Sequence, residues 1–147
     1  GFLPSEKKEK AEILELLKEE TRTMILYESP HHLIRTLKEL YGALGERNIT
    51  ICRELTKKFE AVLPTTLEGA LAFYETQEPR GEYVLVIEGK SLLQKKKERQ
   101  EGFLELGIED HMRRYEEAGL ERKEAMKAVA KDRGVSKREI YQYMLDK

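Results

Sequence analysis

The chain has 147 residues, 37% of them charged, and a formal net charge of −1. This length suits one domain of ordinary size or a domain with a small appendage, and the near-neutral charge provides no global field toward nucleic acid or anionic lipid. The single cysteine, Cys52, excludes an internal disulfide, and no apolar run approaches the ~20 residues of a membrane span. We therefore expect a cytoplasmic protein without membrane contact, in which Cys52 is a buried structural thiol.

Helical patterns alternate with short apolar runs over the first ninety residues. Apolar side chains recur every three or four positions in the helical stretches, and several of the apolar runs lack in/out alternation. The expected helices are 5–20, 29–44 and 65–76, and the expected strands are 23–27, 48–52, 59–63 and 83–89. This order predicts an α/β fold with a mixed, largely covered sheet and flanking helices.

Capping residues indicate where two of these helices begin and end. Ser29 stands at an N-cap position, and Pro30 suits the first helical position after it. Gly45 is placed to end the same helix. The spacing of Thr65 and Glu68 is that of a capping box, which predicts the start of the next helix there.

The composition changes beyond residue 90, which ends the expected α/β domain, 1–90. Residues 91–107 are polar, basic and without periodicity, and they indicate a linker. Residues 108–147 are again helical, with a capping-box pair at Ser136 and Glu139, and a tight glycine-containing turn predicts a helix-turn-helix tail. The apolar residues expected to face one another across that turn are Ala125, Met126, Val129 and Ala130 on one helix and Ile140, Tyr141, Met144 and Leu145 on the other.

Several common catalytic motifs are incomplete in this sequence. The GKS at 89–91 follows a strand, but a phosphate-binding loop needs a glycine at position 84, which is valine. The three histidines, His31, His32 and His111, lack the spacing of metal ligands, and there is no second cysteine to help them. We therefore expect no metal site.

Two charged segments at strand ends are the candidate site. YESPHH, 27–32, joins a strand to a helix, whose first backbone N–H groups suit an anion or the polar edge of a ligand. RELTKKFE, 53–60, follows another apolar strand and contains none of the usual turn residues. These residues alone leave two purely structural alternatives open, namely a capped helix start and a solvated charged turn.

Four segments in order resemble a known family: GFLP at 1–4, YESPHH at 27–32, RELTKKFE at 53–60 and GEYVLVIEG at 81–89. Together they resemble the second half of the bacterial small-subunit ribosomal RNA cytidine 2′-O-methyltransferases, a branch of the tetrapyrrole methylase superfamily. The last two helices resemble the helix-turn-helix tail often found in that branch. The chain begins without Met and lacks the family's G-D-A-G-x-P motif, so we expect only the carboxyl-terminal half. His32 departs from the branch, which usually has Arg there.

The resemblance implies an enzyme with two α/β subdomains that binds S-adenosylmethionine between them and forms a homodimer. The enzyme would transfer the methyl group of S-adenosylmethionine to the ribose 2′-hydroxyl of a cytidine in the 16S RNA of the small ribosomal subunit. The activated methyl of the sulfonium needs mainly alignment with the 2′-oxygen, so no nucleophile or metal is required. The fragment alone is expected to be inactive, because the donor would lose most of its contacts.

The resemblance also implies roles for residues in the matching motifs. The expected donor-binding positions are Glu28, Ser29, Glu54, Leu55, Glu82 and Tyr83. The expected RNA phosphate contacts are Arg53, Lys57 and Lys58. The residues expected to order the site or to assist removal of the hydroxyl proton are His31 and Glu60.

Two other hypotheses stay open. The same fold could belong to a tetrapyrrole methylase acting on a corrin or porphyrin ring, although RELTK and the basic tail argue against this. Alternatively, the chain could be a non-catalytic nucleic-acid-binding module built around the tail. Residues 91–147 hold 14 Lys/Arg against 12 Asp/Glu, a slight excess that argues only weakly for such a module.

Overall fold

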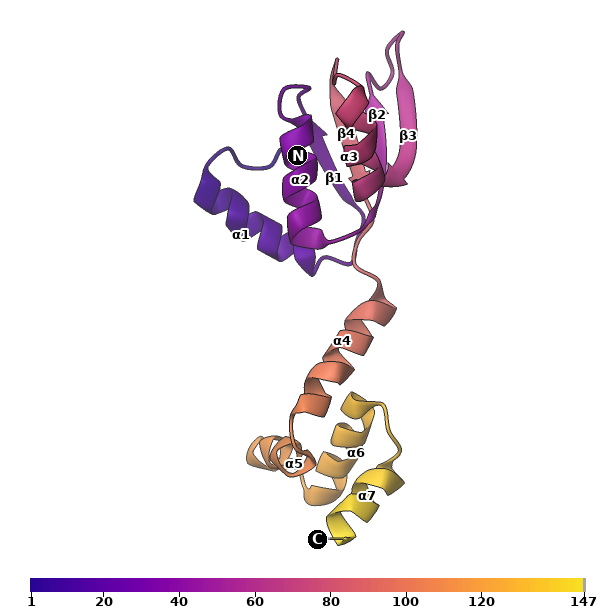
Figure 1. Ribbon diagram of the computed structural model, residues 1–147. Coiled ribbons are helices and arrows are strands. Elements are labelled where there is room, and N and C mark those ends of the chain that lie inside the picture. The colour runs from indigo at the N-terminus through magenta and orange to yellow at the C-terminus, as the bar shows by residue number, and fades with distance from the viewer. Residues whose placement is uncertain (147) are drawn as a thin grey trace. The chain divides into compact units, whose positions relative to one another are not determined.

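The computed structural model describes residues 1–146 and divides the chain into two compact units, Gly1–Ser91 and the residues from Leu92 onward (Figure 1). The first unit contains α1 (Lys7–Lys18), β1 (Met24–Glu28), α2 (Leu33–Leu44), β2 (Asn48–Arg53), β3 (Ala61–Thr66), α3 (Leu67–Thr76) and β4 (Tyr83–Ile87). The second contains α4 (Leu92–Glu105), α5 (Ile108–Glu117), α6 (Arg122–Arg133) and α7 (Lys137–Leu145). Among these described residues, no helix has the length and apolar character needed to cross a membrane.

The four strands form one sheet in the order β1-β4-β2-β3, and every neighbouring pair is antiparallel. The α/β class is confirmed, whereas the expectation of a mixed sheet is wrong. Strands β1 and β2 run in the same direction, but β4 lies between them and pairs antiparallel with both. Consequently the carboxyl ends of β1 and β2 and the amino end of β4 lie together at one end of the sheet.

Helices α2 and α3 cover one face of this sheet (Figure 1). The strand residues that point toward them are almost completely buried, as at Ile51 of β2 and Leu85 of β4, which are 2% and 0% exposed. Leu37 of α2 and Leu67 of α3 belong to the same cluster. Burial of this apolar surface is the main force that holds the first unit together.

The opposite face of the sheet is open, so the expectation of a largely covered sheet holds for one face only. The register aligns two cross-strand rows on it: Ile25, Val86, Thr50 and Pro64 in one row, and Tyr27, Val84, Cys52 and Val62 in the other. Ile25, Tyr27 and Val62 are 52%, 47% and 53% exposed. Cys52 is nevertheless buried and free, as expected.

Two helix starts differ from the expected ones. The backbone N–H of Ser29 donates to its neighbour Glu28, and residues 30–32 form a turn. Helix α2 therefore begins only at Leu33, and its N-cap residue, His32, makes no capping hydrogen bond with its side chain. Helix α3 is capped by Thr66, whose hydroxyl accepts from the backbone N–H of Gly69, instead of by the expected Thr65. The end of α2 at Gly45 is as expected, because Gly45 adopts a positive φ of 70°.

Most of the expected unpatterned linker, 91–107, forms the helix α4, Leu92–Glu105. Its Arg99 guanidinium lies 3.6 Å from the carboxylate of Asp132 in α6, and its Phe103 ring stacks on the His111 imidazole of α5 with centroids 4.4 Å apart. These contacts attach α4 to the tail helices. The sequence did not reveal them because most of the helix is exposed and charged, which obscures its periodicity.

Helices α6 and α7 form the expected helix-turn-helix. Gly134 ends α6 in the left-handed conformation, with φ of 68°, and the capping box of Ser136 and Glu139 is present. The residues expected to face one another are only partly confirmed. Those that are buried are Ala125, Val129, Ala130 and Ile140, with Met126 and Met144 partly buried against them. Tyr141 and Leu145 are instead 52% and 58% exposed, so the inward orientation expected for them is wrong.

A polar cluster lies inside the second unit, around the 1% exposed His111. The Arg133 guanidinium donates to His111 Nδ1 at 3.3 Å, and His111 Nε2 lies 3.4 Å from the carboxylate of Asp132, which also accepts from the Tyr115 hydroxyl. Burial lowers the pKa of His111, and the positive charge of Arg133 adds to the effect. His111 is therefore held as a neutral imidazole that joins α5 to α6.

Candidate functional site

Three of the sequence motifs meet at one end of the sheet. Glu28 at the end of β1 pairs with Tyr83 at the start of β4, and Tyr83 pairs on its other side with Arg53 at the end of β2. A cavity of about 370 Å³ opens here, lined by Phe2, Tyr27, Glu28, Ser29, Glu82, Tyr83 and Val84. Four of the six expected donor-binding residues therefore line one cavity. The other two, Glu54 and Leu55, are not among its lining residues.

Glu54 does not line the cavity, but it supports this end of the sheet through hydrogen bonds to Glu82. Its carboxylate accepts from the backbone N–H of Glu82 at 2.6 Å, and its own N–H donates to the Glu82 carbonyl at 2.8 Å. The hydrogen bond from Glu82, followed by the charge of Lys57, holds the pKa of Glu54 below its ordinary value. Glu54 is thus an anion that fixes the start of β4.

The loop of RELTKKFE has a constrained backbone. Glu54 and Thr56 adopt positive φ angles of 51° and 67°, which residues with side chains rarely do. The expected catalytic residue Glu60 holds this shape, because its carboxylate accepts from the Thr56 N–H at 2.5 Å. Such a conformation persists only where surrounding contacts impose it. The segment is therefore a shaped loop and not a loose solvated turn.

The expected RNA-contact residues belong to the same RELTKKFE segment. Lys57 is half-exposed and bridges two carboxylates, at 2.5 Å from Glu82 and 3.5 Å from Glu54. Lys58 is exposed and lies over the Phe59 ring, with its Nζ 5.6 Å from the centroid. Arg53 is half-buried, and its Nε lacks a hydrogen-bond partner among the described residues.

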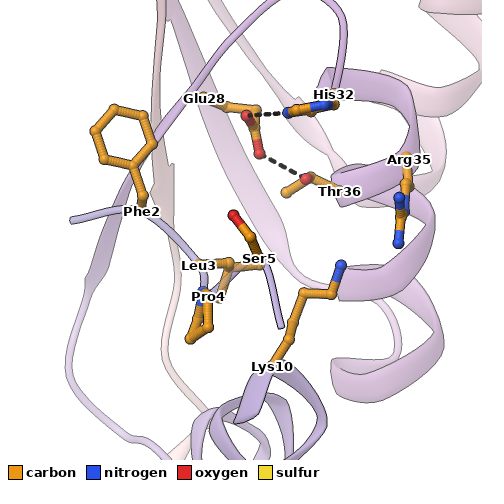
Figure 2. Close-up of a pocket in the computed structure, with 9 residues that line it drawn as sticks. All are labelled: Phe2, Leu3, Pro4, Ser5, Lys10, Glu28, His32, Arg35 and Thr36. Atoms are coloured by element: carbon orange, nitrogen blue, oxygen red, sulfur yellow. Dashed lines mark hydrogen bonds and ion pairs between the residues drawn. The ribbon is translucent and has the colours of Figure 1, made fainter. Parts of the chain in front are cut away.

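A second cavity, of about 290 Å³, lies beside the first and was not expected from the sequence (Figure 2). It is lined by Phe2, Leu3, Pro4, Ser5, Lys10, Glu28, His32, Arg35 and Thr36. In Figure 2 the Glu28 carboxylate faces the side chains of both His32 and Thr36. The carboxylate accepts from the Thr36 hydroxyl at 2.6 Å and from the Ser29 N–H at 2.7 Å, while His32 Nδ1 lies 3.9 Å away.

Glu28 and Phe2 line both cavities, and of the two Glu28 carries the charge. Its side chain is only 10% exposed, and both carboxylate oxygens are hydrogen-bonded. His32 and Thr36 follow Glu28 by four and eight positions, but Glu28 ends strand β1 and helix α2 begins only at Leu33, so helical periodicity could not indicate this contact. The expected His31 is exposed and lines neither cavity.

Across residues 1–146, no group of three or more His, Cys, Asp or Glu side chains gathers in a way that could hold a metal ion. The groups that a ligand could contact at the strand ends are the largely buried carboxylate of Glu28, backbone polar groups and the aromatic rings of Phe2 and Tyr27. That set suits a ligand with both a cationic and an apolar part.

An α/β unit with a cavity at its charged strand ends matches the class that the sequence resembles, the tetrapyrrole methylase type of methyltransferase. No protein-family model matches the chain. Curated proteins named "Ribosomal RNA small subunit methyltransferase I" do match it, at 44% identity in Halalkalibacterium halodurans, 40% in Bacillus subtilis and 37% in Synechocystis. These matches cover 96%, 96% and 99% of this chain but only 48%, 48% and 51% of the relatives.

The chain belongs to the family of these small-subunit ribosomal RNA methyltransferases. It spans about half the length of the curated relatives it matches. The family resemblance and the expectation that the chain represents one half of such a protein are therefore confirmed.

Proposed function

We propose that this chain is the carboxyl-terminal half of an S-adenosylmethionine-dependent methyltransferase that modifies a cytidine ribose 2′-hydroxyl in small-subunit ribosomal RNA. The observation that supports this most directly is the cavity shared by Glu28, Ser29, Glu82 and Tyr83, four of the six expected donor-binding positions. The relatives' name, which specifies a small-subunit ribosomal RNA methyltransferase, supports the substrate class.

The cavity lining suits such a donor chemically. The donor supplies a methyl group activated by a positively charged sulfonium. In the proposed site, the Glu28 carboxylate attracts positive charge across a short distance, because it is 10% exposed and weakly screened by solvent. Phe2 and Tyr27, whose ring centroids lie 5.6 Å apart, offer apolar surface to the ring system of a nucleoside.

The acceptor side of the reaction requires RNA phosphate contacts and a route for the hydroxyl proton. Arg53, Lys57 and Lys58 are our candidates for the phosphates, because they are the basic residues of the shaped RELTKKFE segment, which begins at the same end of the sheet as the cavity. His31 and Glu60 are the candidates that order the site or accept the proton. Of these two, Glu60 already accepts a hydrogen bond from Thr56, whereas His31 is exposed and can present its imidazole to a substrate.

A chimeric enzyme provides the test. The half of the Bacillus subtilis relative that matches this chain is replaced by residues 1–147, and the product is incubated with tritiated S-adenosylmethionine and small ribosomal subunits from a strain lacking that relative. We expect label in 2′-O-methylcytidine after nuclease digestion, with none for the isolated chain. Folded chimera without transfer, or label on a base instead of the ribose, would contradict the proposed function.

A further inference from the structure

The last helix, α7, exposes the large side chains of Tyr141 and Leu145 beside basic residues. Lys137, Tyr141 and Leu145 follow one another at four-residue spacing and therefore share one side of α7. All three are exposed, and so is Arg138 next to Lys137. Among residues 1–146, neither Lys137 nor Arg138 forms an ion pair. We call Lys137, Arg138 and Tyr141 the α7 face.

The one acidic residue inside α7 does not oppose this positive charge. Glu139 is held in the capping box, where its carboxylate accepts from the backbone N–H and the hydroxyl of Ser136 at 2.9 and 2.6 Å. These hydrogen bonds lower the pKa of Glu139 and keep it on the helix start. At 100° per residue, Glu139 projects from a different side of the helix than Tyr141.

The weak net charge of the tail conceals a separation of charge between its helices. Helix α5 contains four acidic residues and two basic ones, Glu109, Asp110, Glu116 and Glu117 against Arg113 and Arg114. Helix α6 presents Lys123, Lys127 and Lys131, all exposed, at four-residue spacing. The count of 14 basic against 12 acidic residues over 91–147 therefore underestimates the local positive charge of α6 and α7.

We propose that the α7 face binds single-stranded RNA. Lys137 and Arg138 contact backbone phosphates, and the Tyr141 ring stacks on an unpaired base. Basic side chains beside an exposed aromatic ring are the combination with which proteins recognise unpaired nucleotides. In DNA-binding helix-turn-helix units, the second helix is the one that meets the nucleic acid, and α7 holds that position here. The choice of RNA as partner rests on the proposed function, whereas the surface itself rests on the exposure of Tyr141 and its basic neighbours.

Fluorescence anisotropy with the full 147-residue chain tests this inference. The probe is a fluorescein-labelled single-stranded RNA of mixed sequence and about 12 nucleotides, a length within the usual range of single-strand sites. We expect Tyr141→Ala to weaken binding by about 5- to 140-fold, the loss of one stacked base. We expect K137Q/R138Q to reduce the slope of log affinity against log salt by about 1.4, the loss of two phosphate contacts.

Two control variants separate recognition from a general loss of charge or structure. K7Q/K8Q removes two adjacent exposed lysines from the first turn of α1, as K137Q/R138Q does in α7, and is expected to leave affinity and salt slope unchanged. Tyr141→Phe keeps the ring and is expected to bind within about twofold of wild type, because stacking needs no hydroxyl.

Three results would overturn the inference: no binding of the RNA, equal effects of the α1 and α7 double variants, or tighter binding of duplex DNA of the same length. The assay uses no methyl donor. A chimera that fails to transfer methyl therefore contradicts the proposed function without affecting this measurement, and the reverse also holds.

Discussion

The Glu28 carboxylate and the Thr36 hydroxyl are joined by a 2.6 Å hydrogen bond between the end of strand β1 and the first turn of helix α2. This bond fixes the charged residue that lines both cavities. Because the Glu28 side chain is only 10% exposed, water stabilises its charge little. The second hydrogen bond to its carboxylate comes from the Ser29 N–H at 2.7 Å. The bond to Thr36 therefore connects the stability of the first unit to the shape of its candidate site.

Replacing this hydroxyl tests how much the site depends on it. We expect Thr36→Val to lower the free energy of unfolding by about 1.5–3 kcal/mol, the usual worth of a hydrogen bond to a charged group. Urea denaturation followed by circular dichroism measures the change. Thr50→Val is the matched control, because Thr50 lies on the open sheet face and should change stability by less than about 0.5 kcal/mol. Equal effects of the two variants would mean that the bond contributes little.

The close approach of Gly81 to Glu54 predicts a second stability effect. A Cβ at Gly81 would lie 2.6 Å from a Glu54 carboxylate oxygen, and the residue has a φ of 79°. We expect Gly81→Ala to destabilise the first unit by about 1–3 kcal/mol and to weaken the fixed start of β4. Gly42→Ala, in the open surface of α2, should instead stabilise the protein by up to about 1 kcal/mol. A neutral Gly81→Ala would show that the Glu54 loop adapts without cost.

The buried His111 predicts a pH dependence of the second unit. Burial, followed by the charge of Arg133, lowers its pKa in the folded state, although Asp132 acts in the opposite direction. Below a pH of about 6.5, the unfolded chain therefore binds this proton more readily, and stability falls with acidification by at most about 1.4 kcal/mol per pH unit. Unfolding of wild type and His111→Gln at pH 7.5, 6.5 and 5.5 measures the difference.

The relevant quantity is the difference in pH slope between the two proteins, because carboxylates of the chain also titrate. His31→Gln replaces an exposed histidine and should retain the wild-type slope. An unchanged slope in His111→Gln would contradict the assignment of a neutral buried imidazole.

The open face of the sheet predicts self-association of the isolated chain. Ile25 and Val62 are 52% and 53% exposed on a surface that includes two rows of apolar strand residues, and contiguous apolar patches of this kind favour association. We expect sedimentation velocity to show a dimer or larger species at high concentration. Ile25→Lys should raise the dissociation constant at least about tenfold, or about 1.4 kcal/mol. Leu16→Lys, on the exposed side of α1, is the control, and a strictly monomeric wild type would contradict the expectation.

Much of this fold could be predicted from local patterns. Helix and strand positions follow from apolar periodicity, and the capping box of Ser136 and Glu139 depends on residues three positions apart. The antiparallel order of the sheet could not be predicted in this way, because β4 inserts between β1 and β2 from far along the sequence. Strand neighbours are decided by packing and register between distant segments.

Only part of the candidate site could be predicted, because it too depends on contacts between distant segments. The motifs indicated Glu28 and Tyr83 as ends of strands, and the register then placed them side by side. The sequence did not indicate the hydrogen bond to Thr36, because it depends on how α2 is oriented against β1. Tyr141 is a similar case. It was expected to face inward together with its neighbour Ile140, but in the structure Ile140 is buried and Tyr141 is exposed.

Calorimetric titration with S-adenosylmethionine tests the central claim most directly, namely that the strand-end cavity is one half of a methyl donor site. The isolated 147-residue chain and the Bacillus subtilis chimera are titrated under the same conditions. We predict no measurable heat for the chain alone and clear binding by the chimera, weakened at least about tenfold by Glu28→Gln through the loss of about 1.4 kcal/mol. Equal binding by the isolated chain and the chimera would contradict the account, since the donor site would then be complete within these residues.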